Sequence, residues 1–216
     1  MIKGFKALII GATGATGKDL VNVLLQDNTY TEVVIFVRRT TQITHPKLEE
    51  ILTDFDDLEK VSAQINGDVL FICLGTILKA AGSKDKQRHI DYAIPLKFAE
   101  IAKRNHMTRV VLLSAYGASA TSKVFYSKLK GELEEDISKL ALDQYIIFRP
   151  GLLLRKDSDR LGEKISAGVL KFLNALGLIK KFKPLPTSLL AEKLAKAPNS
   201  LPNGKHIVEL DDIFRF

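Results

Sequence analysis

The feature that most constrains this chain is a glycine-rich turn, residues 11–17, with the sequence Gly-Ala-Thr-Gly-Ala-Thr-Gly. An apolar run precedes the turn, and apolar residues at helical spacing follow it. A strand, a glycine-rich turn and a helix in this order are typical of a dinucleotide-binding site. In such a site Gly11 permits the tight turn, Gly14 lets a pyrophosphate approach the backbone, and Gly17 lets the helix pack close to the sheet. The alternative is an ordinary glycine turn of an α/β protein.

Apolar, β-branched runs alternate with helical patterns along most of the chain. Because the strand runs are continuously apolar, we expect strands that are buried on both faces and joined by right-handed βαβ units. The pattern predicts an α/β fold of the Rossmann type, a doubly wound parallel sheet in three αβα layers. The expected strands are residues 5–10, 33–37, 48–53, 69–74, 109–114, 144–148 and 206–210, and the expected helices are 17–27, 56–65, 85–105, 122–141, 160–176 and 187–196.

The regular alternation fades after Arg149-Pro150-Gly151. We therefore expect residues 1–216 to form one domain in which 151–200 contribute a small substrate cap. The cap would lie at the carboxyl edge of the sheet, where open α/β folds bind ligands. Within it, apolar residues at helical spacing in 160–183 predict either a mobile lid or a permanently packed helix.

Composition limits the class of protein and the compartment. The 216 residues are 46% apolar, and no apolar run is long enough to span a bilayer. A secretory signal peptide is not expected, because the first strand and its turn occupy the first seventeen residues. The single cysteine, Cys73, cannot form an internal disulfide and is expected to be a buried core thiol. These observations predict a cytoplasmic protein.

The charge of the chain is uneven. Of the net charge of +7, residues 155–196 supply +6, from ten Lys or Arg and four Asp or Glu. A basic segment attracts nucleic acid, acidic lipid or a phosphorylated substrate, and the alternative is a solvated basic surface. No nucleic-acid motif accompanies this charge. We expect a small-molecule substrate, no nucleic-acid or membrane partner, and a monomer or homodimer with a possible protein partner.

Arg38-Arg39-Thr40 follow the second expected strand, at the position where a site for NAD usually places Asp or Glu. Guanidinium groups bind phosphate in a bidentate fork, so the arginines predict a preference for NADP(H) over NAD(H). The alternative is a pair of solvent-facing arginines. Asp54-Phe55 follows the third strand, where Asp54 either contacts the adenine or caps the helix that begins near Asp56. Gly75 and Thr76, after Cys73 and Leu74, are further candidates for cofactor contact.

Tyr126 and Lys130 are four residues apart in a helical pattern, a spacing that places both side chains on one helix face. An ammonium beside a phenol favours the phenolate, so Tyr126 is the candidate general acid or base toward a carbonyl or alcohol. Ser114 ends the fifth strand, where its hydroxyl would orient the reacting oxygen. Such a pair also occurs by chance in surface helices. Tyr116 is a candidate for the pocket wall.

Other chemistries find little support in the sequence. Asp91 is expected to be a structural hydrogen-bonding residue rather than an acid. The four histidines have no partners at metal-ligand spacing, so no metal site is expected. The chain has no Gly-x-Ser-x-Gly elbow, which leaves serine-hydrolase chemistry unsupported.

Taken together, Gly-Ala-Thr-Gly-Ala-Thr-Gly, Cys-Leu-Gly-Thr, Leu-Leu-Ser, Tyr-Ser-Lys-Leu-Lys-Gly-Glu-Leu-Glu and Phe-Arg-Pro-Gly resemble the short-chain dehydrogenase/reductase superfamily in its atypical or extended branch. The chain is most similar there to the Tat-interacting tumour-suppressor oxidoreductases and their bacterial NAD(P)-binding, epimerase-like relatives. The resemblance covers about residues 5–155. It implies that Tyr126 is the acid or base, that Lys130 holds the nicotinamide ribose, and that Ser114 assists. Asp91 lies where many extended relatives have asparagine.

These observations predict an NADP(H)-dependent oxidoreductase of a small carbonyl or alcohol. The alternatives are an NADPH-binding regulatory or redox-sensing protein with little catalysis, and an epimerase-like activity on a sugar derivative. The predicted catalytic residues are Ser114, Tyr126 and Lys130. The predicted cofactor-binding residues are Gly11, Thr13, Gly14, Ala15, Thr16, Gly17, Arg38, Arg39, Asp54, Phe55, Cys73, Leu74, Gly75, Thr76, Tyr126, Lys130, Pro150 and Gly151.

Overall fold

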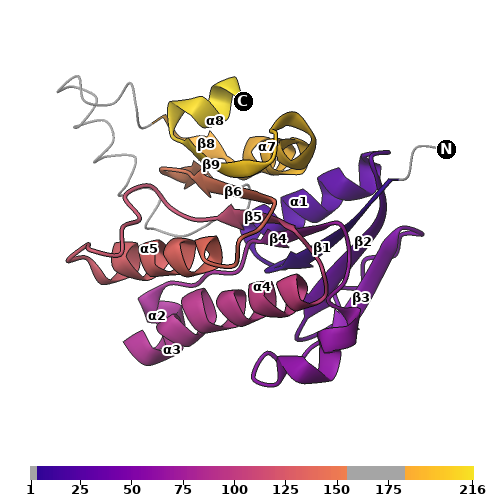
Figure 1. Ribbon diagram of the computed structural model, residues 1–216, viewed down its shortest axis with the longest axis horizontal. Coiled ribbons are helices and arrows are strands. Elements are labelled where there is room, and N and C mark those ends of the chain that lie inside the picture. Colours follow the sequence, from indigo (N-terminus) through magenta and orange to yellow (C-terminus); the bar gives the residue numbers. More distant parts are fainter. Residues whose placement is uncertain (1–3, 155–182) are drawn as a thin grey trace.

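Seven parallel strands form one sheet in the order β3-β2-β1-β4-β5-β6-β9 (Figure 1). The computed structural model describes residues 4–154 and 183–216. Because the strand order reverses between β1 and β4, a crevice is expected at their carboxyl ends. A second sheet pairs β7 with β8. The strands are β1 (Phe5–Ile10), β2 (Tyr30–Val37), β3 (Leu48–Leu52), β4 (Val69–Ile72), β5 (Arg109–Leu113), β6 (Gln144–Arg149), β7 (Leu153–Leu154), β8 (Leu185–Pro186) and β9 (Gly204–Glu209).

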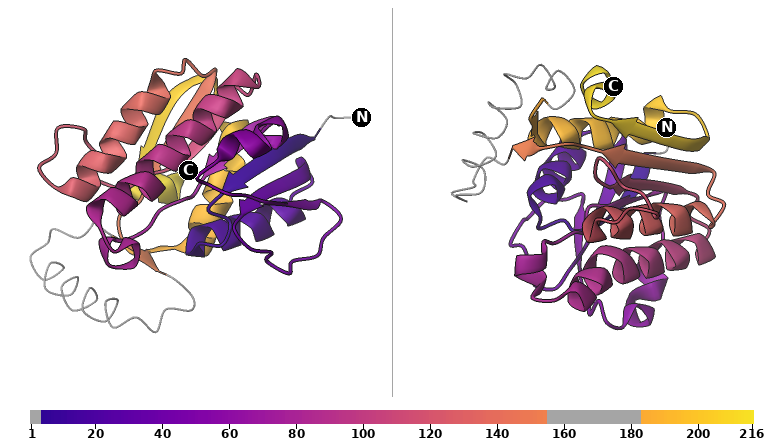
Figure 2. Two further views of the ribbon diagram at one scale, coloured as in Figure 1. Left: turned by 90° about the horizontal axis from the view of Figure 1, so that it is seen from below. Right: turned by 90° about the vertical axis from the view of Figure 1, so that its left-hand side faces the viewer.

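Helices cover both faces of the sheet, as the turned views also show (Figure 2). Each face of the sheet has its own hydrophobic core. Alternate residues of β1 contribute to the two cores, because successive side chains of a strand point to opposite faces. Ala7 and Ile9 pack with α1 and α7, whereas Leu8 and Ile10 pack with α4 and α5. The helical segments are α1 (Ala15–Gln26), η1 (Leu58–Gln64, a 3₁₀-helix), α2 (Leu78–Ala81), α3 (Lys84–Arg88), η2 (His89–Ala93, a π-helix), α4 (Ile94–Arg104), α5 (Phe125–Ser138), α7 (Thr187–Ser200) and α8 (Asp211–Arg215).

The Rossmann-type doubly wound parallel sheet is confirmed, and all seven expected strands are present with small shifts at their ends. The expected helix at 85–105 is wrong in one respect, because a π-helical turn divides it. Pro95 explains the position of that turn. Proline has no N–H to donate to the carbonyl of Asp91, four residues earlier. The N–H of Ile94 instead donates to His89, five residues earlier.

The expected cap needs a correction at its C-terminal end. Residues 187–200 form α7, which lies against α1 and buries Leu190 and Leu194 in the core of the sheet. The apolar residues of α7 pack on the face of the sheet that α1 also covers. This helix therefore belongs to the helical layer on that face and not to a cap. The expected lid or packed helix at 160–183 lies outside the described residues except for residue 183. Most of the basic segment 155–196 lies outside them too.

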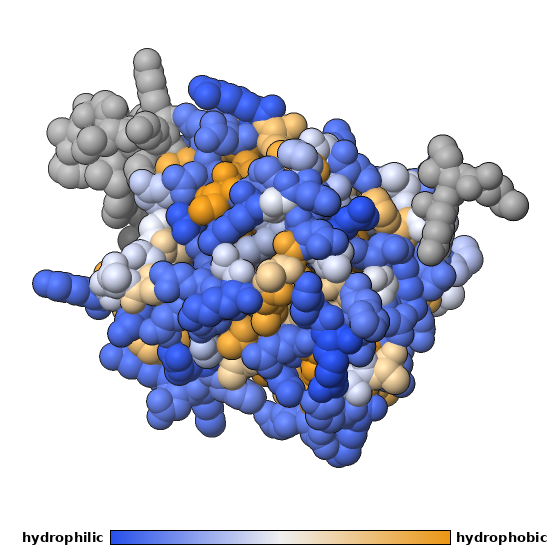
Figure 3. Space-filling model, viewed as in Figure 1, coloured by the Kyte–Doolittle hydropathy of each residue, from blue (hydrophilic) through white to orange (hydrophobic). Residues whose placement is uncertain are grey.

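Hydrophilic side chains cover most of the molecular face shown in Figure 3, with short apolar stretches between them. In the described part of the chain, no helix combines the length and the apolar character that crossing a membrane would require.

Candidate functional site

The three glycines of the 11–17 turn have different surroundings. Gly11 has a φ of +83°, and a Cβ there would overlap the backbone of Cys73 at the end of β4. A Cβ on Gly17 would overlap the carbonyl oxygen of Gly11. At Gly14 the nearest atom would be the Gly11 oxygen, 3.3 Å away, and the remaining space is open. Gly11 and Gly17 therefore let the chain pack on itself, whereas Gly14 leaves room for a ligand.

This difference predicts opposite results for two alanine variants. Gly17→Ala should destabilise the fold by about 1–3 kcal/mol, the usual effect of overpacking, because backbone atoms block the new methyl group. Gly14→Ala should leave the melting temperature nearly unchanged and weaken cofactor binding, because its methyl group would enter the open space. Thermal unfolding and cofactor titration of both variants test this. Equal melting temperatures for the two variants would contradict it.

The turn leads into a helix start that is suited to a phosphate. Gly14 is the N-cap of α1, no side chain caps the helix, and its first turn has no acidic residue. Helix N-termini attract anions through free N–H groups and the positive end of the helix dipole. These N–H groups lie at the switch point between β1 and β4, where the crevice was expected.

Three adjoining cavities follow the carboxyl edge of the sheet from this point. The central cavity, of about 500 Å³, has residues 11–14 and 73–76 in its wall. The tyrosine cavity, of about 320 Å³, shares Gly14 and residues 73–76 with it and is also lined by Tyr126. The arginine cavity shares Thr13 and Arg38 with the central cavity. A dinucleotide is an extended molecule, and these shared walls provide a continuous path for one.

Asp54 and Phe55 line the central cavity, as expected for contact with an adenine. The alternative of Asp54 as a helix N-cap is wrong. Its side chain accepts the N–H of Asp56 within the turn, at 3.0 Å, while η1 begins only at Leu58. Nearby, His89 and Asp56 form a pair at 2.8 Å between Nε2 and Oδ1, and both line the same cavity.

The arginine cavity is lined by Thr13, Arg38, Arg39 and Thr40. Both arginine side chains are exposed, and neither has an ion pair or hydrogen bond within the described part of the chain. Two unpaired guanidinium groups beside a cavity can receive a phosphate without first breaking another contact.

The predicted catalytic residues come together around the tyrosine cavity. Tyr126 and Lys130 extend from α5, and Ser114 follows β5. Gly131 makes this arrangement possible, because a Cβ there would overlap the backbone of Ser119 and Ala120. The helix can therefore approach the loop that follows β5.

The expectation that Lys130 favours the phenolate of Tyr126 is wrong. Partial burial and the neighbouring carboxylate of Asp91 instead raise the pKa of Tyr126 to about 12. The side chain is 40% exposed, and its hydroxyl has no hydrogen-bond partner among the described residues. Tyr126 is therefore protonated at neutral pH and has a proton to donate.

Lys130 is buried, with 2% of its surface exposed. Burial lowers the pKa of its ammonium, and the neighbouring Asp91, Cys73 and Glu134 oppose that shift. Its Nζ would lie 3.7 Å from a Cβ on Gly75, and it has no hydrogen bond within the described chain. The amino group of Lys130 thus lies beside the wall that the central and tyrosine cavities share, where it can donate to a ligand.

Asp91 is a structural hydrogen-bonding residue, as expected. Its side chain is fully buried, and its Oδ1 accepts the backbone N–H of Thr76 at 2.7 Å. Gln87 Nε2 bridges the carbonyl of Thr76, at 3.3 Å, and the other carboxylate oxygen of Asp91, at 3.5 Å. These bonds fix the loop after β4 that separates the central and tyrosine cavities.

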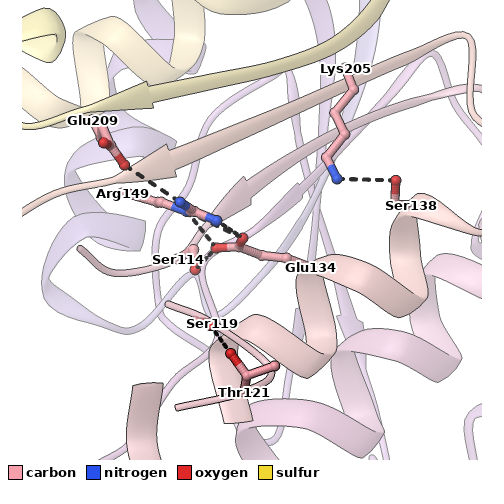
Figure 4. A network of polar contacts seen from close by, with 8 residues as sticks. All are labelled: Ser114, Ser119, Thr121, Glu134, Ser138, Arg149, Lys205 and Glu209. Carbon is pink, nitrogen blue, oxygen red and sulfur yellow. Dashed lines mark hydrogen bonds and ion pairs between the residues drawn. The ribbon is translucent and has the colours of Figure 1, made fainter. Parts of the chain in front are cut away.

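Ser114 has a partner that the sequence analysis missed. Its hydroxyl donates to Glu134, which is 3% exposed and also receives Arg149 Nε at 3.1 Å and Nη2 at 2.5 Å (Figure 4). Arg149 reaches on to Glu209 at 3.5 Å. With its hydrogen directed at Glu134, Ser114 can accept but not donate a hydrogen bond in the cavity.

Of the remaining predicted residues, Cys73 lines the cavities, whereas Pro150 and Gly151 do not. Cys73 packs against the core as expected, but it is half-buried rather than fully buried because it also lines two cavities. Desolvation raises the pKa of its thiol to about 12. Pro150 accepts the backbone N–H of Tyr116 at 3.0 Å, and neither Pro150 nor Gly151 belongs to the described cavity walls. The described residues contain no cluster of three potential metal ligands.

Sequence reasoning missed several wall residues. Some of them lie at the ends of strands, and the others lie on the helical segments after β4. The residues at strand ends could have been predicted by considering the end of every expected strand. The missed wall residues are Ala12, Phe36, Val37, Thr40, Thr53, Asp56, Ile77, Ala80, Lys86, His89, Ile90, Ile94, Leu113 and Leu153.

Comparison with known proteins decides the family. A family model described as NAD(P)H-binding matches residues 11–168. The chain belongs to this NAD(P)H-binding family. The chain is 34% identical over 187 residues to the protein FMP52, mitochondrial, of Candida albicans, covering 83% of this chain and 82% of that one. It is 34% identical over 173 residues to the protein HTATIP2 of Rattus norvegicus, covering 78% and 70%, which confirms the predicted resemblance to the Tat-interacting group.

A solved structure supports the fold of this NAD(P)H-binding chain. The putative NAD-dependent epimerase/dehydratase from Bacillus halodurans superposes with a TM-score of 0.71 at 18% identity, covering 94% of this chain and 92% of that one. The prediction of a cytoplasmic location is contradicted by the first comparison, since that relative is named a mitochondrial protein. A single unpaired cysteine indicates a reducing environment only, and the cytoplasm is not the only such compartment.

Proposed function

We propose that the chain is an NADP(H)-dependent oxidoreductase that reduces a small carbonyl compound. One observation carries the proposal: Tyr126, with a protonated and unpaired hydroxyl, shares a cavity with the buried side chain of Lys130. This cavity adjoins the glycine turn on one side and, through the central cavity, the two arginines. The site thus combines a proton donor with a path for a dinucleotide.

Two features of this chain fit the cofactor: the open space beside Gly14 and the start of α1, which no side chain caps. Together they would receive the pyrophosphate. When bound, NADPH supplies a hydride to the carbonyl carbon. The chain supplies the rest. Lys130 would bind the nicotinamide ribose, and Tyr126 would pass its proton to the carbonyl oxygen. Ser114 would accept a hydrogen bond from the resulting hydroxyl, since its own hydrogen is held by Glu134.

The raised pKa of Tyr126 keeps its hydroxyl protonated, as the role of acid in a reduction requires. A general acid must hold its proton at the working pH, and Tyr126, with a pKa of about 12, does so throughout the neutral range. A panel of aldehydes, ketones and quinones, assayed by loss of NADPH absorbance, tests the proposal. Absence of turnover with every class would refute it and favour the alternative of a regulatory NADPH-binding protein. The bond between Ser114 and Glu134, which keeps one hydroxyl from a substrate carbonyl, is the observation in favour of that alternative.

Cofactor choice should follow Arg38 and Arg39. One hydrogen bond to a charged group contributes about 1.5–3 kcal/mol, so NADPH should bind about tenfold to a hundredfold more tightly than NADH. Replacing both arginines with alanine should remove most of this preference and leave NADH affinity unchanged. Titration of cofactor fluorescence measures both dissociation constants. Equal affinities in the unaltered protein would refute the assignment.

A further inference from the structure

The segment after β2 that carries the two arginines is held to the protein in one place. Residues 39–44 lie outside helices and strands. Among the described residues, every hydrogen bond that joins 39–44 to another part of the chain ends on the carboxylate of Glu50. The other bonds of this segment are internal, from Gln42 to Thr40 and from Ile43 to Thr41.

Glu50 uses both carboxylate oxygens for this attachment. Oε2 accepts the hydroxyl of Thr40 at 2.7 Å and the N–H of Thr41 at 3.1 Å. Oε1 accepts the same N–H at 3.2 Å and the hydroxyl of Thr41. Partial burial raises the pKa of Glu50, but the hydrogen bonds from the two threonines outweigh it and lower the pKa below its ordinary value. Glu50 is therefore a full carboxylate at neutral pH, which strengthens each bond.

The attachment point adjoins the arginine cavity. Thr40, which donates to Glu50, lines that cavity together with Arg38, Arg39 and Thr13. The arginine side chains are exposed and have no partner in the described chain that could hold them in place. Their approach to the cavity depends on the path of the backbone at residues 39–41, and Glu50 is what fixes that path.

We propose that Glu50 is a positioning residue that sets the preference for the 2′-phosphate of NADPH, although it does not itself line the arginine cavity. This inference rests on the proposed function. Without the carboxylate, residues 39–44 would have to be ordered when the cofactor binds, and that conformational entropy would be lost from the binding free energy. The loss would fall on NADPH, because NADH has no phosphate for the arginine cavity.

The test compares Glu50→Gln with Glu49→Gln. Gln has nearly the size of Glu but no charge, and one end of its amide is a donor, so it cannot accept all the bonds from Thr40 and Thr41. Glu49 is the neighbouring residue on β3, exposed and without a side-chain hydrogen bond in the described chain. Glu50→Gln should weaken NADPH binding by about tenfold, the equivalent of about one lost hydrogen bond, and leave NADH affinity unchanged. Glu49→Gln should change neither.

Each other outcome overturns the inference. Unchanged or tighter NADPH binding in Glu50→Gln would show that the carboxylate does not position the site or that its charge repels the phosphate. Equal weakening of NADPH and NADH would show a general effect on the fold. A wild-type protein that binds both cofactors equally would instead refute the proposed NADPH preference, and this inference with it. NADH affinity thus serves as the folding control within each variant.

Discussion

Replacing Tyr126 with phenylalanine should lower the turnover of a carbonyl substrate by about 10²–10⁴-fold, the usual contribution of a positioned general acid. The change keeps the ring and removes the hydroxyl. Ser114, the other hydroxyl predicted to be catalytic in this cavity, cannot replace it as a donor, because its hydrogen is held by Glu134. NADPH affinity should change little, since the phosphates lie at the glycine turn and the arginine cavity. Steady-state kinetics and cofactor titration separate the two effects.

Tyr92 offers a matched control. Its hydroxyl donates to Asp136 at 2.6 Å and lies outside the three cavities of the described residues. Tyr92→Phe removes an identical group and should leave turnover nearly unchanged. If Tyr126→Phe also reduced the substrate at the normal rate, the proposed mechanism would be wrong even with the fold and cofactor correct. Because the pKa of Tyr126 is raised to about 12, its acid form should persist, and activity should not decline through its deprotonation, below about pH 11.

The parts of the site that the sequence predicts correctly are those fixed by local rules. A strand followed by a glycine turn places Gly14 at the helix start, and a spacing of four residues places Tyr126 and Lys130 on one face of α5. The parallel topology then brings Ser114 to the same edge of the sheet. None of these steps requires knowledge of which distant side chains meet.

The features that the sequence does not predict depend on contacts between distant residues. Glu134 is on a helix and Arg149 ends a strand, and nothing in their local sequence shows that they pair or that Ser114 joins them. Glu50 meets Thr40 only after the chain has crossed back and formed β3 parallel to β2. The pKa of Tyr126 depends on desolvation and on Asp91, so the spacing to Lys130 alone predicted the wrong direction.

Replacing Arg149 with leucine should lower the free energy of unfolding by about 3 kcal/mol, because it leaves Glu134 as an uncompensated buried charge. Arg149 is the main partner of that carboxylate and forms a bidentate ion pair with it. The arginine side chain is 21% exposed, so water would reach part of the site, and the value lies at the low end of what a fully buried pair loses. Denaturant unfolding at neutral pH measures the loss.

A surface pair and a double variant distinguish charge burial from simple loss of packing. Arg104→Leu removes an arginine from an exposed pair with Glu59 and should leave stability almost unchanged. Adding Glu134→Gln to Arg149→Leu should restore a large part of the lost stability, because no buried charge then remains without a partner. If the double variant were as unstable as the sum of the two single variants, the network of Ser114, Glu134 and Arg149 would owe its stability to shape rather than charge. Ser114 would then also keep its orientation for reasons other than the carboxylate.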